Sequence, residues 1–156
     1  MQSAYDVALI CLNGHVVNDH SLDRPDRNTK HCMKCGQIAI NKCVNCNGPI
    51  RGAAARVYGG YQLPGYCSEC GKPFPWTAAA ISAAKDYADI LEGITTSEKE
   101  EIKLAIGELA AESPKQTVAA AKFRKIAAKA GQAALDGFQK ILVAVVSETI
   151  KKSIWP

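Results

Sequence analysis

Cysteine is the residue type whose spacing in this chain could do chemistry. The seven cysteines and one histidine form four pairs, three of the form Cys-x2-Cys and one of the form Cys-x3-His: Cys11/His15, Cys32/Cys35, Cys43/Cys46 and Cys67/Cys70. Thiolate and imidazole are ligands that zinc prefers, and a tight turn carrying two of them supplies half of a tetrahedral site. These eight ligands therefore predict two structural zinc ions.

Two pairings of the four motifs are compatible with their spacing. In sequential pairing the first two motifs bind one ion and the last two bind the other, whereas in cross-braced pairing the first joins the third and the second joins the fourth. Sixteen residues separate the first two motifs and twenty separate the last two, and each half ends on Cys-x2-Cys-Gly. Because such a repeat folds most simply around one metal per unit, we favour sequential pairing, with cross-bracing as the alternative.

An odd number of cysteines leaves one thiol over from any complete set of disulfides, so metal binding explains the count better than oxidation does. The other two histidines are expected outside the ligand set. His20 lies in the polar stretch 18–30 and is expected to be exposed to solvent. His31 adjoins Cys32, so we expect it beside the metal or on the surface.

The distribution of these motifs predicts a small metal-bound α+β protein with two domains. Residues 1–76 would form a double zinc ribbon, with units at about 1–40 and 41–76, because every Cys and His lies there. Residues 77–156, rich in Ala, Lys, Glu and Ile, would form a helical domain. Within the ribbon, the pattern predicts one strand over 5–12 and a β-hairpin over 53–66 around Gly59-Gly60.

About four helices are expected in the second domain, because start and stop signals punctuate its sequence. In chain order these signals are Thr77 as an N-cap after prolines that deny an earlier start, Gly93 as a stop, Ser97 with Glu100 as a capping box, Ser113-Pro114 as a start and Gly131 as a stop. The fourth helix would run unbroken from about Gln132 to Ser153, with Gly137 in its first turns or at its start.

The expected fourth helix is apolar over an unusually broad arc, which is typical of a central or subunit-interface helix. The arc comprises Phe138, Ile141, Leu142, Val143, Val145, Val146, Ile150 and Ile154. Association with a membrane surface is the alternative, although only Lys151 and Lys152 would anchor it.

Nucleic-acid binding is suggested by the basic residues. The stretch 113–135 contains no acidic residue, and two arginines lie near tyrosines that could stack on bases. The candidate contacts are Arg51, Arg56, Lys122, Arg124, Lys125 and Lys129. The formal charge of +4 falls to about +1 once seven thiolates and two zinc ions are included. The acidic helix that precedes the basic one also offers it partners, so this function is the alternative.

A zinc ion with four protein ligands has no position for a substrate or an activated water, so the predicted sites argue against an enzyme. No pairing of a nucleophile with a base stands out, and no small-molecule substrate is implied. The sequence favours a non-enzymatic protein-interaction or scaffolding module that self-associates or docks on a protein partner through its helices. No apolar run approaches the roughly 18 residues of a membrane span, and no signal peptide opens the sequence, so we expect a cytoplasmic protein.

Several runs of the sequence resemble an uncharacterised bacterial family, a domain of unknown function with a double zinc ribbon and a helical tail. The similar runs are 10–16, 43–50 and 70–77 in the ribbon, and 113–120, 128–131 and 147–152 in the tail. The resemblance covers nearly the whole chain. It implies a bacterial origin and zinc binding, and it implies no activity.

Overall fold

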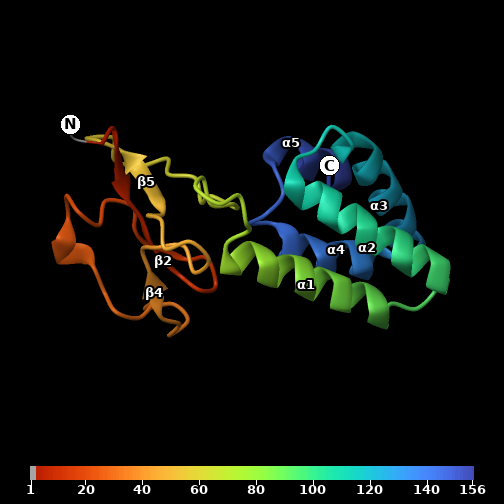
Figure 1. Ribbon diagram of the computed structural model, residues 1–156. Coiled ribbons are helices and arrows are strands. Elements are labelled where there is room, and N and C mark those ends of the chain that lie inside the picture. Colours follow the sequence, from red (N-terminus) through yellow and green to blue (C-terminus); the bar gives the residue numbers. More distant parts are fainter. Residues whose placement is uncertain (1–2) are drawn as a thin grey trace. The chain divides into compact units, whose positions relative to one another are not determined.

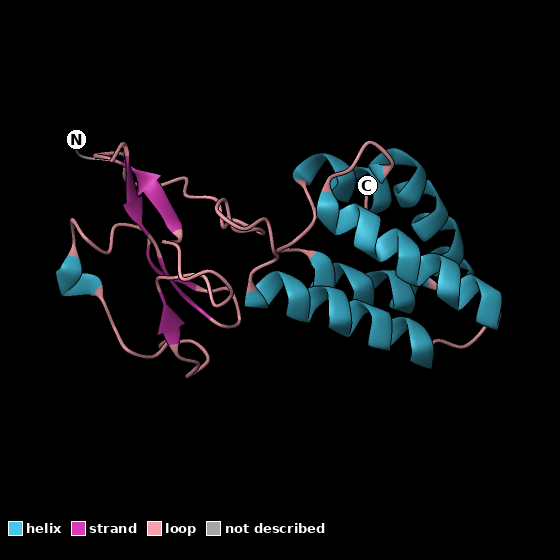
Figure 2. Cartoon of the chain, in the orientation of Figure 1, coloured by secondary structure: helices cyan, strands magenta, loops and turns pink. Residues whose placement is uncertain are grey.

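The computed structural model describes residues 3–156, and the chain divides into two compact units between Ala78 and Ala79 (Figure 1). This division lies two residues beyond the boundary expected at Trp76. The first unit contains the strands, and the second contains most of the helical residues (Figure 2). The expected class, a small α+β protein with a strand-containing N-terminal part and a helical C-terminal part, is confirmed.

The first unit contains five short strands in two antiparallel sheets. The strands are β1 (Tyr5–Val7), β2 (Leu9–Cys11), β3 (Val16–Asn18), β4 (Ala39–Ile40) and β5 (Arg51–Ala54). One sheet has the order β1-β5 and the other the order β3-β2-β4. The single strand expected over 5–12 is therefore wrong. Ala8 separates β1 from β2, which belong to different sheets. It is fully buried, and its N–H donates to the carbonyl of Ile50, 2.8 Å away.

The hairpin expected around Gly59-Gly60 is also wrong. β5 pairs with β1, with Tyr5 opposite Ala54, and residues 55–65 after it contain no strand. The residues after β5 form a loop in which Arg56, Gly59 and Gly60 all have positive φ. This loop closes back on β5, since the Tyr61 hydroxyl donates to the carbonyl of Arg51 at 2.6 Å.

A small apolar core holds the first unit together. Its buried members are Ala8, Ile10, Cys43, Ile50, Cys67, Phe74 and Trp76. The rings of Phe74 and Trp76 stack with centroids 4.7 Å apart, and the Trp76 indole N–H donates to the carbonyl of Pro64 at 2.9 Å. Two of the metal-motif cysteines thus belong to the core itself, which couples metal binding to the folding of this unit.

Five helices follow, where about four were expected. They are α1 (Pro75–Ile90), α2 (Thr96–Ala111), α3 (Gln116–Ala130), α4 (Gln132–Leu142) and α5 (Glu148–Ile154). The prolines do not prevent an early start, because Pro75 occupies the first turn of α1, where its missing N–H removes no helical hydrogen bond. Thr77 is therefore inside α1, fully buried, rather than at its N-cap.

The unbroken helix expected over 132–153 is wrong, because the chain leaves helical geometry between Leu142 and Glu148. Ser147 is extended, with φ −63° and ψ 153°, and α5 begins after it. Leu142, Val146 and Ile150 are all buried in the core of the second unit. The broad apolar arc thus comes from two helices and the turn between them, all packed on one core. It gives no support to an interface helix, and of its members only Val143 is an exposed large hydrophobic residue.

The capping box of α2 lies two residues earlier than expected. Thr95 Oγ1 accepts from the N–H of Glu98 at 3.1 Å, and Glu98 Oε2 accepts from the N–H of Thr95 at 2.8 Å. Thr95/Glu98 and Ser97/Glu100 both match the capping-box pattern. The structure uses the earlier pair, so α2 begins at Thr96. The expected stop at Gly131 is confirmed, since α3 ends at Ala130.

Gly137 lies within α4 and does not mark its start. A Cβ at this position would overlap the ring and hydroxyl of Tyr87. The Tyr87 ring packs edge-on against Phe138, with centroids 4.9 Å apart, and Phe138 packs in the same manner against Phe123. The glycine therefore allows an aromatic side chain of α1 to approach the backbone of α4.

Candidate metal centres

The first cluster brings together Cys11, His15, Cys32 and Cys35. Cys11 ends β2, and the turn after it carries His15, whose carbonyl accepts from the N–H of Cys11 at 3.0 Å. Cys11 Sγ lies 3.5 Å from His15 Nδ1 and 3.7 Å from Cys35 Sγ. Cys32 Sγ lies 3.6 Å from the same Nδ1. The imidazole therefore offers its Nδ1 to a centre that it shares with three sulfurs.

The second cluster brings together Cys43, Cys46, Cys67 and Cys70. Cys43 Sγ lies 3.8 Å from Cys70 Sγ, and Cys46 Sγ lies 3.6 Å from Cys67 Sγ. These contacts cross between the two Cys-x2-Cys turns, so each turn supplies two corners of one cluster. Both clusters follow sequential pairing, and the cross-braced alternative is not formed.

The three Cys-x2-Cys turns share one backbone pattern. The N–H of the first cysteine donates to the carbonyl five residues later, and the N–H four residues later donates back to the carbonyl of that cysteine, all at 2.8–2.9 Å. The residue that donates back is Gly36, Asn47 or Gly71, each with positive φ, a conformation that Gly and Asn adopt more readily than other residues. The local sequence therefore dictates the turn, which presents two sulfurs on one side.

Backbone N–H groups also point at the sulfurs. Lys34, Gly48 and Glu69 each donate to a cysteine Sγ at 3.4 Å. The N–H groups of Cys46 and Asn45 lower the pKa of Cys43 to about 6. The N–H of Gly48 favours the thiolate of Cys46, but burial and the neighbouring thiols Cys67 and Cys70 oppose it and raise the pKa of Cys46 to about 12. A second thiolate in the cluster thus needs a compensating positive charge.

The spacing of the donor atoms fits zinc. A tetrahedral ion with Zn–S bonds of about 2.3 Å and Zn–N bonds of about 2.0–2.1 Å would hold neighbouring donors roughly 3.5–3.8 Å apart. The five separations given above are 3.5–3.8 Å, and all donor atoms of a cluster lie within 4.8 Å of one another. Disulfides would require sulfurs about 2.05 Å apart, and all seven cysteines are free. The two clusters are thus consistent with two structural zinc ions.

The two histidines outside the clusters have different environments. His31 is exposed on the surface, which is one of the two positions expected for it. His20 is buried, with only 3% of its surface exposed, so the expectation of an exposed side chain is wrong. Its Nε2 lies 2.8 Å from the carbonyl of Val57, and its Nδ1 lies 3.9 Å from a carboxylate oxygen of Asp6. His20 therefore ties the loop after β5 to the start of the chain.

The six candidate nucleic-acid contacts are divided between the two units. Arg51 lies over the ring of Tyr5, with its guanidinium carbon 4.6 Å from the ring centroid, and Arg56 is exposed in the following loop. Lys129 forms an ion pair with Glu98 of α2 at 2.6 Å, and an Arg124 guanidinium nitrogen donates to the carbonyl of Ser153 at 3.3 Å. Lys122 and Lys125 are exposed.

The Lys129–Glu98 pair supports the expectation that the basic helix α3 packs beside the acidic helix α2. Part of the basicity of α3 is therefore neutralised within the chain. Two exposed aliphatic residues that no sequence motif indicates lie on the same pair of helices. Leu104 and Val118 are exposed by 75% and 59%. The exposure of Leu104 could be expected from the sequence, because this residue falls outside the apolar stripe of α2.

Comparison with known proteins identifies one family. A family model described as an uncharacterized protein conserved in bacteria (DUF2321) matches residues 4–154, which is almost the entire chain. No curated protein and no solved structure matches the chain. No helix within residues 3–156 combines the length and apolar character that crossing a membrane would require.

Proposed function

We propose that this chain, which belongs to the bacterial DUF2321 family, is a zinc-stabilised, non-enzymatic protein-interaction module. One observation carries the proposal: in both clusters, four protein side chains supply the four donors of a tetrahedral ion. A catalytic zinc keeps one position open for water or substrate, and here no position is left. The ions then act as crosslinks.

The first unit depends on such crosslinks. Its strands are only two to four residues long, and its core contains seven buried residues. A core of this size gives little stability by itself, whereas structural zinc in small fingers contributes on the order of 10–16 kcal/mol of apparent binding free energy. When bound, the ions hold the four turns in place, and the loops between them become a rigid surface.

The second unit supplies the surface for self-association. Its core accounts for the apolar residues of α4 and α5, but Leu104 on α2 and Val118 on α3 stay exposed. Exposed aliphatic side chains on neighbouring helices are more consistent with a protein partner than with a purely solvated face. Ordinary ion pairs satisfy other charges of these helices, as between Lys129 and Glu98.

The proposal is tested by replacing zinc with Co2+ in the full chain and recording the absorption spectrum before and after azide is added. Co2+ with four protein ligands should show the thiolate charge-transfer and d–d bands of a tetrahedral site, and azide should leave them unchanged because no position is open. A spectrum that changes with azide would reveal an exchangeable ligand and would contradict a purely structural role.

A regulatory protein that binds nucleic acid is the second candidate. It is favoured by the absence of acidic residues over 113–135 and by the exposed Lys122 and Lys125 on α3. Binding of this kind would weaken steeply with salt, because each phosphate contact releases counterions. Titration of labelled double-stranded and single-stranded DNA at two salt concentrations distinguishes the candidates. Tight, salt-dependent binding lost in Lys122→Glu would favour this function over the first.

A further inference from the structure

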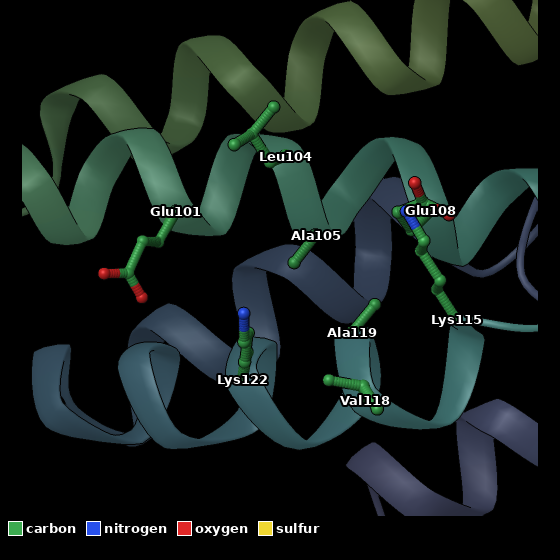
Figure 3. A pocket seen from close by; sticks show the side chains of 8 residues that line it. All are labelled: Glu101, Leu104, Ala105, Glu108, Lys115, Val118, Ala119 and Lys122. Atoms are coloured by element: carbon green, nitrogen blue, oxygen red, sulfur yellow. The ribbon is translucent and has the colours of Figure 1, made fainter.

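A groove runs between α2 and α3. It has a volume of about 490 Å³ and is lined on the α2 side by Glu101, Leu104, Ala105 and Glu108, and on the α3 side by Lys115, Val118, Ala119 and Lys122. The two helices are antiparallel, since Glu98 contacts Lys129 at one end while the side-chain amide of Gln116 donates to the carbonyl of Leu109 near the other. Figure 3 shows Ala105 and Ala119 facing one another across the groove. Small residues thus leave the groove open.

The two sides of the groove carry opposite charges. Both acidic residues lie on the α2 side and both basic residues lie on the α3 side. Glu101 and Lys122 extend into the groove toward one end, and Glu108 and Lys115 lie toward the other (Figure 3). Among residues 3–156, no ion pair involves any of these four charges. Glu108 does accept a hydrogen bond from the Ser113 hydroxyl, which leaves its negative charge unpaired.

We propose that this groove is the self-association surface, and that it binds the same groove of a second copy about a two-fold axis parallel to the helices. The inference rests on the self-association included in the proposed function. A rotation about this axis exchanges the two sides of the groove and keeps each position along it. Glu101 then faces Lys122 of the second copy, and Glu108 faces Lys115. A single two-fold contact satisfies all four charges in each chain.

The exposed aliphatic side chains follow the same symmetry. Leu104 of one copy approaches Val118 of the other, so both become buried at the centre of the contact. Central aliphatic contacts surrounded by charged pairs are the usual arrangement of a protein interface. The other two-fold axis in the plane of the contact reverses positions along the groove, so that Glu101 would face Glu108 and Lys115 would face Lys122. Like charges would then meet at every pair, and the charge pattern selects the parallel axis.

The first test measures the mass of the zinc-loaded full chain by sedimentation velocity over a wide range of concentrations. The wild-type chain should dimerise, and Leu104→Asp should raise the dissociation constant about tenfold or more, because it places a carboxylate at the centre of the contact. Ile90→Asp is the control, since Ile90 is 73% exposed at the end of α1, outside the groove. Both sites are exposed, so neither variant removes a core side chain.

The second test identifies the axis by exchanging charges. Glu101→Lys and Lys122→Glu should each weaken the dimer, because each creates like charges across the contact. An equal mixture of the two variants should dimerise again. In the mixed dimer the lysine introduced by the first variant faces the glutamate introduced by the second, and the unchanged Glu101 and Lys122 complete the other pair. Lys140→Glu on α4, away from the groove, controls for the change in net charge.

The outcomes separate this inference from the proposed function. A chain that stays monomeric at every concentration, a dimer that is insensitive to Leu104→Asp, or a mixture that fails to reassociate would overturn the groove or its axis. None of these results alters the cobalt spectrum. A spectrum that changes with azide would instead overturn the structural role of the metal, whatever the state of association.

Discussion

The Sγ atoms of Cys43 and Cys70 lie 3.8 Å apart, although 27 positions separate these residues in the sequence. Cys43→Ser removes one corner of the second cluster and leaves the first intact. We expect the bound zinc to fall from two ions per chain to one, because three thiolates retain a structural ion poorly. Zinc is counted by inductively coupled plasma mass spectrometry on the purified full chain.

Val44→Ser is the control for this variant, because Val44 occupies the same turn, is 61% exposed and donates no ligand. It should retain two zinc ions. Retention of two ions in Cys43→Ser would contradict the ligand assignment.

Removal of both ions with a chelator should unfold the first unit and spare the second. Every cluster residue lies before Ala78, whereas the helical unit has its own buried core around Phe123 and Phe138. In 1H–15N NMR spectra, the amide signals of Gly36 and Gly71 should lose their dispersion, while those of α2 to α4 should stay in place. Loss of the helical signals at the same chelator concentration would argue against independent units.

The contact between Gly137 and Tyr87 predicts opposite effects for two glycine substitutions. Gly137→Ala adds a methyl group where the Tyr87 ring lies, so it should lower the free energy of unfolding by about 1–3 kcal/mol. Gly107→Ala on α2 meets no atom within 4 Å and should raise it by about 0.4–1 kcal/mol, because alanine restricts the unfolded chain. Urea unfolding followed by circular dichroism measures both. Equal effects would contradict the packing of α1 on α4.

The capping register of α2 is tested by Thr95→Ala and Ser97→Ala. Thr95→Ala removes the oxygen that accepts from the N–H of Glu98 and should cost about 0.5–2 kcal/mol. Ser97→Ala lies within the first turn of α2, where alanine is a good helix former, and should change stability little. The same urea measurement applies, and a larger loss in Ser97→Ala would restore the register expected from the sequence alone.

The metal clusters were predictable because their geometry is local. Each Cys-x2-Cys turn is dictated by residues within one short segment, and Gly36 and Gly71 mark the position of positive φ. The preference for sequential pairing followed from the repeat, and the contacts between Cys11 and Cys35 and between Cys46 and Cys67 agree with it. These features can be predicted without knowing which distant residues come into contact.

Three expectations that the structure corrects concern features that depend on distant residues. β5 pairs with β1, far away in the sequence, so no local signal near Gly59 could reveal it. His20 lies in a polar segment, but a contact with the carbonyl of Val57 buries it. Leu142 and Ile150 lie on either side of the break before α5 and belong to the same core. Their spacing also fits one continuous helix, so the sequence pattern does not reveal the break. In each case tertiary packing outweighed a local preference.

X-ray absorption at the zinc K edge determines whether each ion has four protein ligands. We expect seven sulfur neighbours and one nitrogen neighbour in total for the two ions of each chain, with Zn–S distances of about 2.3 Å. Fewer sulfur neighbours together with an oxygen neighbour from bound water would contradict it, because such an ion would have the open position that a structural site lacks.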